Sequence, residues 1–218
     1  ETLKQVMEAK HPGVQIVGTF VPPFRAVFSE EENDQMIQAI NAMKPEVGSV
    51  EARQVPLEHP KDYIPGTGVT GWSSTAYLMT ARLAFEKVGG FDSKTFFLYC
   101  DDVDYSWRIR LAGYRVVYEP AATVFHDKRL SIKAEWLSSD AEVFYSAQAA
   151  LLLAYKYSRD DVLNDIREDF VKSNNPEISR ALRSFENLKE EGNLPNRIDP
   201  RVPRTHCGTA KRAAPFNQ

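Results

Sequence analysis

The sequence contains little cysteine and no long hydrophobic run. Its two cysteines, Cys100 and Cys207, lie far apart, and no Cys-x-x-Cys spacing occurs in the 218 residues. Neither a zinc site nor a disulfide framework is indicated, and the low cysteine content fits a reducing compartment. The longest apolar patch, residues 149–154, is far shorter than the ~20 residues that a bilayer-spanning helix needs. No internal repeat occurs either, so a repeat architecture is not indicated. We expect a globular cytoplasmic protein, with the inner face of the membrane as an alternative location.

The sequence also lacks an excess of positive charge. The formal net charge is −3, and 43% hydrophobic with 26% charged residues is an ordinary globular composition. Basic residues concentrate after Asp199, where no acidic residue follows, but aromatic residues are not interleaved with them. We therefore expect no nucleic-acid partner, and we predict that residues 196–218 form an irregular, solvated basic tail.

An acidic stretch follows an aromatic run in the middle of the chain. Three aspartates come directly after residues 96–100: Asp101, Asp102 and Asp104. Apolar residues then recur every four positions, at Val103, Trp107 and Leu111. This spacing is typical of a helix and places the acids in its first turn. One interpretation is an acidic cap that accepts hydrogen bonds from free backbone N–H groups. The alternative is a catalytic carboxylate, kept ionised by the helix dipole and ready to accept a proton.

Hydrophobic periodicity predicts a mixed α/β chain. Strands are predicted at 14–20, 50–55, 72–79, 114–118 and 122–125, with a turn at residues 119–120. Helices are predicted at 2–10, between 29 and 45, at 81–88, from the acidic stretch to Gly113, and at 141–157, 161–172 and 176–190. Thr80 is expected to cap the helix over 81–88 and Gly89-Gly90 to end it, while residues 138–140 form a cap for the long helix that follows.

The first 47 residues carry one resemblance. It rests on His11-Pro12-Gly13-Val14-Gln15-Ile16-Val17-Gly18-Thr19, Pro22-Pro23-Phe24 and Ile40-Asn41-Ala42-Met43-Lys44-Pro45-Glu46-Val47. This segment resembles part of the WecG/TagA family, whose members transfer N-acetylmannosamine-type sugars from UDP. The Pro-Lys-Gln-Glu motif of that family does not follow, so no catalytic residue is carried over. We interpret residues 1–47 as a remnant or a fusion-derived α/β piece.

Seven short motifs follow one another between residues 53 and 127. They are Arg53-Gln54-Val55-Pro56, Glu58-His59-Pro60-Lys61, Gly71-Trp72-Ser73-Ser74, Phe85-Glu86-Lys87-Val88-Gly89-Gly90-Phe91-Asp92, Phe97-Leu98-Tyr99-Cys100-Asp101-Asp102-Val103-Asp104, Gly113-Tyr114-Arg115 and Val124-Phe125-His126-Asp127. In order and spacing they resemble glycosyltransferase family 2, which adopts the GT-A fold. The rhamnosyltransferase-like members, which build bacterial surface polysaccharides, look most similar.

The resemblance implies roles for the acidic residues. Family 2 enzymes invert at the anomeric carbon and need one carboxylate to take the proton of the acceptor hydroxyl. That role maps onto Asp102, with Asp101 orienting the site or contacting the acceptor. Asp104 is a further candidate for substrate binding, although its place inside the first helical turn favours a structural role.

Three other residues are candidates for contacts with substrate or metal. His126 matches the histidine that some family members use to bind Mn²⁺ or Mg²⁺ beside the donor diphosphate, where the metal neutralises charge on the leaving group. Trp72 is a candidate for stacking on a sugar face, with core packing as the alternative. Arg129 is a candidate for binding phosphate, with a surface salt bridge as the alternative.

The donor-binding half of the GT-A fold is missing from this pattern. Its Asp-x-Asp motif does not occur before Gly48. The sequence therefore predicts an α/β protein with a partial GT-A-like core and a helical carboxy-terminal extension. The predicted segments are a WecG/TagA-like fragment at 1–47, an acceptor-side half at 48–159, a helical extension at 160–195 and the tail at 196–218.

Two functions are consistent with these segments. The first is an inverting glycosyltransferase, which moves a rhamnose-like sugar from a nucleotide-diphosphate donor to a glycan or lipid-linked acceptor. The second is a non-catalytic remnant or an acceptor-glycan-binding module. A partner chain that supplies the donor half and a peripheral association with the membrane are further expectations of the resemblance.

Overall fold

A computed structural model describes residues 34, 46–56, 58–59, 61–126 and 138–198. The helix–strand–helix pattern predicted for the first 45 residues lies outside this part, apart from Asp34. Arg129 and residues 199–218 of the predicted tail also lie outside it.

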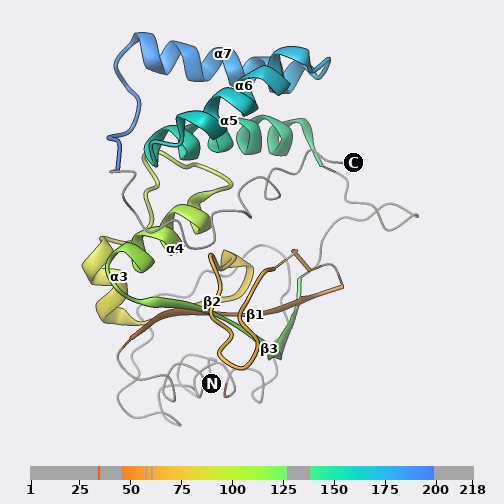
Figure 1. The fold of residues 1–218 in the computed structure, drawn as a ribbon. Coiled ribbons are helices and arrows are strands. Elements are labelled where there is room, and N and C mark those ends of the chain that lie inside the picture. Colours follow the sequence, from red (N-terminus) through yellow and green to blue (C-terminus); the bar gives the residue numbers. More distant parts are fainter. Residues whose placement is uncertain (1–33, 35–45, 57, 60, 127–137, 199–218) are drawn as a thin grey trace, which may run out of the picture.

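A three-stranded sheet forms the base of the described part (Figure 1). The central strand β1 (Val47–Val55) pairs antiparallel with β2 (Leu78–Thr80) and parallel with β3 (Arg115–Phe125). The strand predicted at 50–55 is confirmed and begins earlier, at Val47. Because β1 and β3 run parallel, their carboxyl ends meet at one edge of the sheet, which is where α/β proteins place their ligands.

The strand β3 replaces the two short strands predicted at 114–118 and 122–125. The predicted turn at Glu119-Pro120 is wrong, and a shift in register takes its place. Ala52 pairs with Glu119, whereas the next residue of β1, Arg53, pairs with Thr123. Proline cannot donate a hydrogen bond to the ladder, so the extra residues bulge from the sheet and the strand continues.

The strand predicted over residues 72–79 is wrong for most of its length. Only β2 (Leu78–Thr80) is extended, and a short 3₁₀ helix, η1 (Thr75–Tyr77), precedes it. The Ser74 hydroxyl accepts a hydrogen bond from the backbone N–H of Ala76 and so begins η1. Such local bonds of serine hydroxyls compete with strand formation, which strand propensity alone does not show.

The helix α3 (Arg82–Val88) ends as predicted, at Gly89 in the left-handed conformation. Its predicted cap is wrong, because the capping position is Ala81. The Thr80 hydroxyl instead donates to the carbonyl of Gly48 at 2.9 Å and lies 2.6 Å from the hydroxyl of Tyr105. Thr80 therefore connects the edge of the sheet to the helix above it.

The acidic stretch begins α4 (Asp101–Leu111), which packs on the sheet. Its buried residues Tyr105 and Ile109 contact Val116 of β3, and all three are fully buried. A Cβ atom on Gly48 of β1 would lie 2.5 Å from the Cγ2 atom of Ile109. The missing side chain of Gly48 therefore lets the carboxy-terminal half of α4 approach the start of β1.

Three further helices form the layer on the other side of α4 (Figure 1). They are α5 (Asp140–Lys156), α6 (Asp160–Lys172) and α7 (Pro176–Glu190), in agreement with the helices predicted at 141–157, 161–172 and 176–190 to within a residue at either end. Ser139 and Glu142 form a capping box at the start of α5. Within the described ranges, no helix has the length and apolar character that a membrane crossing requires.

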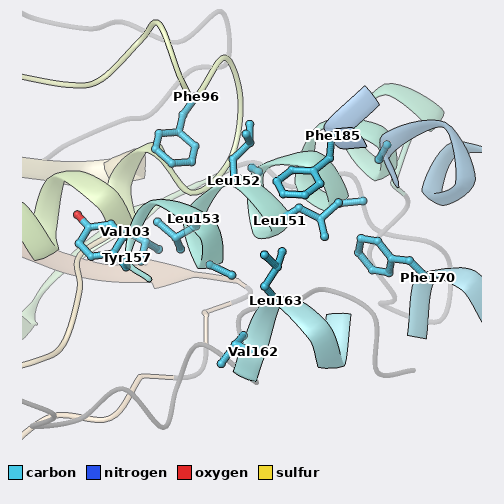
Figure 2. Packing of buried hydrophobic residues seen from close by; sticks show 14 of the residues in the cluster. Phe96, Val103, Leu151, Leu152, Leu153, Tyr157, Val162, Leu163, Phe170 and Phe185 are labelled. Atoms are coloured by element: carbon cyan, nitrogen blue, oxygen red, sulfur yellow. The ribbon is translucent and has the colours of Figure 1, made fainter. Parts of the chain in front are cut away.

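One apolar cluster joins this helical layer to the segment around α4 (Figure 2). Leu151 of α5, Phe170 of α6 and Phe185 of α7 belong to it. Phe96 and Val103, from the acidic stretch and the residues before it, belong to the same cluster. The helical extension and the predicted acceptor-side half therefore share a core.

Asp104 lies at the centre of a buried charge cluster beside this core. Its carboxylate accepts from Lys156 Nζ at 2.6 Å, from Arg108 Nε at 2.8 Å and from the Tyr157 hydroxyl at 3.0 Å. The side chain of Asp104 is fully buried, and that of Lys156 is 8% exposed. Lys156 also contacts Asp92 at 2.8 Å. This cluster ties α4, α5 and the loop before α4 together.

Replacing Lys156 by methionine tests how much this cluster contributes to the stability of the fold. Lys156→Met leaves the buried Asp104 carboxylate with one cation fewer, and we expect a loss of about 3–5 kcal/mol in the free energy of unfolding. Urea unfolding followed by circular dichroism measures this loss. The control is Lys172→Met, since that side chain is 72% exposed and its removal should change stability by less than about 0.5 kcal/mol. Equal losses in the two variants would contradict the proposed role of Lys156.

Candidate functional site

The acidic end of α4 follows an unusual backbone turn. Tyr99 and Cys100 both adopt the left-handed conformation, with φ of 67° and 56°. Residues other than glycine rarely do so, and each such residue costs about 1–3 kcal/mol, typically at a functional site. The turn ends at the capping position of α4, where Cys100 makes no side-chain cap. It therefore directs the chain so that Asp101 and Asp102 begin the helix.

The first two aspartates bond to the free N–H groups of the first helical turn. The Asp102 carboxylate accepts from the N–H of Val103 at 2.8 Å, and the Asp101 carboxylate accepts from backbone N–H groups of residues 101 and 102. The predicted capping role is thus present, but from positions just inside the helix. Both side chains are half-buried, so they combine this role with access to solvent.

Contacts between α4 and β1 form a series that leads to the acids. Gly48 faces Ile109 near the carboxyl end of α4. One step further along β1, the Ser49 hydroxyl lies 3.4 Å from that of Ser73, which in turn lies 3.2 Å from the hydroxyl of Ser106. As β1 advances, its contacts therefore move toward the amino-terminal end of α4.

The next residue on this face of β1, Glu51, belongs to a buried ion pair. Its Oε2 atom lies 2.6 Å from Lys61 Nζ, and the two side chains are 2% and 3% exposed. Lys61 also donates to the backbone carbonyl of Trp72 at 3.2 Å, and its ammonium lies 3.5 Å from the centroid of the Trp72 ring. Asp102 precedes Ser106 by one helical turn, and Glu51 follows Ser49 by two residues, so the series of contacts brings this pair toward the acidic end of α4. The charges of Glu51 and Lys61 both influence the pKa of Asp102.

Burial raises the pKa of Asp102 to about 7. This value is a net result: the neighbouring Asp101 carboxylate and Glu51 contribute to the rise in pKa, while the Val103 N–H and Lys61 oppose it. Burial also raises the pKa of Asp101 and of Glu51. Desolvation therefore outweighs the helix terminus that was expected to keep Asp102 ionised. A carboxyl group with this pKa exchanges a proton at neutral pH, as general acid–base catalysis requires.

The structure separates Asp104 from the other two aspartates. Its fully buried carboxylate lies on the opposite side of α4's first turn, within the cluster formed with Arg108 and Lys156. No part of the side chain reaches solvent in this arrangement. This placement agrees with a structural role and not with substrate binding.

Trp72 lies at the candidate site, but one face of its ring is already used. The Lys61 ammonium covers that face, and the ring of His59 lies 5.9 Å away in a tilted arrangement. Trp72 is half-buried and packs against the main apolar cluster. The core-packing alternative is therefore present, and stacking on a sugar stays a prediction.

His126 follows directly after β3, at the carboxyl end of the parallel strand pair. Its Nδ1 atom lies 3.1 Å from Gln54 Oε1, and Gln54 in turn donates to Glu51 at 3.2 Å. A polar chain therefore connects His126 to the Glu51–Lys61 pair. Mn²⁺ and Mg²⁺ require several oxygen ligands, and within the described ranges no three histidine, cysteine or acidic side chains gather into a metal site. These residues alone do not fit the implied metal.

Sequence analysis assigned no role to three residues of this site: Glu51, Gln54 and Lys61. Polar residues alternate with apolar ones along β1, and alternation normally indicates a strand with one solvated face. Here α4 covers that face, so Ser49 and Glu51 are buried, whereas Arg53 near the end of the strand is exposed. Gln54 and Lys61 lie outside the alternation. The alternation was the available signal, but only the packing of α4 reveals its meaning.

Comparisons with known proteins relate part of this chain to glycosyltransferases. No protein-family model matches it. A 64-residue segment is 44% identical to N-acetylglucosaminyl-diphospho-decaprenol L-rhamnosyltransferase of Mycobacterium tuberculosis, covering 29% of this chain and 20% of that protein. The rhamnosyltransferase WbbL of Escherichia coli is 36% identical over 67 residues, which are 31% of this chain and 25% of that protein.

A third relative is the pre-mycofactocin glycosyltransferase of M. tuberculosis, 38% identical over 85 residues, or 37% of this chain and 17% of that protein. The chain thus spans about a fifth of the length of the curated relatives that it matches. These matches support the predicted relationship to glycosyltransferases. Membership of family 2 and the WecG/TagA resemblance stay predictions.

The raised pKa of Asp102 predicts how stability depends on pH. The folded protein holds the proton of Asp102 up to about pH 7, whereas the unfolded chain releases it near pH 4. This contribution to stability is present below about pH 4 and is lost as the pH rises to about 7. We therefore expect Asp102→Asn to raise the free energy of unfolding at pH 8 by on the order of 1 kcal/mol and to have no effect near pH 4.

Thermal unfolding of the native chain and the variant at several pH values measures this difference. Asp169→Asn, at an exposed helical aspartate, is measured in parallel as the control. A stability difference that is constant from pH 4 to pH 8 would contradict the raised pKa.

Proposed function

We propose that this chain forms the acceptor side of an inverting glycosyltransferase, with Asp102 as the general base. The observation that carries this proposal is a half-buried carboxyl group with a pKa of about 7 at the start of α4. The segments matched by two rhamnosyltransferases and a further glycosyltransferase support the reaction class. A rhamnose-like sugar is the proposed cargo, moved from a nucleotide-diphosphate donor.

The proposed step is a single displacement at the anomeric carbon. The acceptor hydroxyl oxygen attacks this carbon while the ionised Asp102 takes its proton. The bond from the anomeric carbon to the diphosphate oxygen breaks, and the nucleotide leaves with the electron pair. Because a sugar hydroxyl is a very weak acid, the carboxylate must lie within hydrogen-bonding distance of it when the proton moves. Asp101, the next carboxylate along the helix, is proposed to orient the acceptor.

The donor side of the reaction needs groups beyond those described. The described sheet has three strands, and its residues gather no metal ligands. We propose that the remaining donor-binding groups come from elsewhere in the full protein or from a partner chain. His126 would then contribute one ligand to a Mn²⁺ or Mg²⁺ ion beside the leaving diphosphate, where the ion offsets negative charge.

The acceptor is proposed to be a glycan or a lipid-linked sugar. One relative is named for a lipid-linked substrate, a diphospho-decaprenol. An acceptor of this kind would bring the protein to the inner face of the membrane as a peripheral protein in the cytoplasm. A role in the synthesis of surface polysaccharide follows from the same proposal.

Asp102→Asn separates this enzyme from its alternative, a module that only binds the acceptor glycan. Asparagine keeps the acceptor oxygen for the Val103 N–H but cannot take a proton, so we expect transfer to fall by at least ~100-fold. Binding of the acceptor glycan should change by less than about threefold, or ~0.6 kcal/mol. Transfer is measured with a labelled sugar donor in the presence of the segment or partner chain that supplies the donor-binding groups, and glycan binding by calorimetry.

Asp169→Asn serves as the matched control and should retain full transfer. Undiminished transfer by Asp102→Asn would contradict the proposed base. Glycan binding without transfer in both the native chain and the variant would favour the binding module.

The missing donor groups predict weak nucleotide binding by this chain alone. We expect calorimetric titration with UDP or dTDP to give a dissociation constant of ~1 mM or weaker, with or without Mn²⁺. Tight, Mn²⁺-dependent binding that His126→Ala removes would contradict this expectation, and it would show that the chain itself holds a donor site.

A further inference from the structure

We propose that Lys61 is a positioning residue for Asp102, held by Glu51 and Trp72 so that its ammonium supports the ionised carboxylate at the start of α4. A role of Lys61 in catalysis rests on the proposed function. Its physical content, the coupling of three charged side chains from three segments, can be tested without any transfer reaction.

Three contacts restrain the Lys61 ammonium. Glu51 lies 2.6 Å away on β1, the Trp72 carbonyl lies 3.2 Å away, and the Trp72 ring centroid lies 3.5 Å away. A lysine side chain that is 3% exposed is uncommon, since lysine normally keeps its charge in water. Most lysine side chains are flexible, so their charge has no fixed position. These contacts hold the Lys61 ammonium in one place.

The stability of the fold alone does not explain why the Glu51–Lys61 ion pair is buried. Removing two charges from water costs several kcal/mol, and an apolar pair of similar volume often supports the fold equally well. Glu51 illustrates the cost, because burial raises its pKa even with Lys61 in contact. Fold stability therefore does not explain why the Glu51–Lys61 pair is buried, and the charges of both side chains act on the proposed base at the start of α4.

The charges around Asp102 come from several segments. Asp101 on α4 and Glu51 on β1 disfavour its ionised form, whereas Lys61 is the cation that favours it. The Cys100 thiol lies in the same environment, and burial beside these carboxylates raises its pKa, so it carries no charge at neutral pH. Lys61 therefore stands between two carboxylates, bonded to one and acting on the other.

This arrangement suits a base that gains a proton during the reaction. Before the step, Lys61 stabilises the ionised Asp102. Once Asp102 holds the proton of the acceptor, Lys61 still has Glu51 as its ion-pair partner. The buried ammonium is consequently never left without a counter-charge, which would be costly in this environment.

A purely structural pair would behave differently from a positioning pair. Under the positioning hypothesis, removal of the Lys61 charge leaves two buried carboxylates without their cation and makes Asp102 harder to ionise. Removal of the Glu51 charge leaves Lys61 with Asp102 as its remaining carboxylate and makes Asp102 easier to ionise. The two substitutions therefore have opposite effects on Asp102, whereas a loss of structure would give no such opposition.

The test is a carbon NMR titration of the Asp102 side-chain carboxyl in the full 218-residue chain, with the signal assigned by Asp102→Asn. We expect Lys61→Met to raise the titration midpoint of Asp102 by about one pH unit and Glu51→Gln to lower it by a similar amount. Lys61→Arg keeps the charge and should leave the midpoint within about half a unit of the native value.

Shifts in the same direction, or no shift in either variant, would overturn the proposal. If Lys61→Met does not fold, the double variant Glu51→Gln/Lys61→Met removes both charges, and its midpoint should lie above that of Glu51→Gln. A double variant that titrates like Glu51→Gln would equally overturn the proposal.

The titration also distinguishes this inference from the proposed function. If no transfer is detected but the midpoints move in opposite directions, the positioning role stands and the proposed enzyme fails. If transfer is lost in Asp102→Asn but the midpoints do not move, the enzyme stands and the positioning role fails. Where transfer is measurable, the acidic limb of its pH profile should move with the NMR midpoint in each variant.

Discussion

The buried carboxylate of Asp104 is the interaction on which the described structure depends most. It accepts from Lys156 of α5, from Arg108 of its own helix and from the Tyr157 hydroxyl. Arg108 also donates to the carbonyls of Val88 and Gly90, at 2.7 Å each. A fully buried charge must be paired and hydrogen-bonded, so α4 can take only the position at which all these partners reach it.

The position of α4 determines the environment of the two aspartates at its start. Gly48 and the serine contacts bring the helix close to β1, and the Glu51–Lys61 pair lies at the end of this contact. The helical layer covers the other side through Phe96 and Val103. Asp102 lies at the start of this packed helix, and its burial there is the main cause that brings its pKa close to neutral. The site depends on packing as much as on the acidic motif.

The relationship to glycosyltransferases concerns only part of this chain and part of each relative. The matched segments cover about a third of the chain and about a fifth of each relative. They support a relationship to glycosyltransferases, whereas the acceptor-side site with its base and the origin of the donor groups are our proposals. The buried lysine beside the base is a feature that neither the matched names nor the acidic motif would suggest.

Local signals in the sequence determined where the helices begin and end, and which acids start α4. Residues 138–140 predicted the start of α5, and Gly89 the end of α3, because capping bonds join neighbours in the chain. Only the tertiary structure decided that Asp104 is structural, that residues 115–125 form one strand, and that Asp102 resists ionisation. Each of these depends on partners far along the chain, such as Lys156, Ala52 and Lys61. Burial and long-range pairing carry no signature in the local pattern, because a charged residue looks the same in sequence whether it is solvated or enclosed.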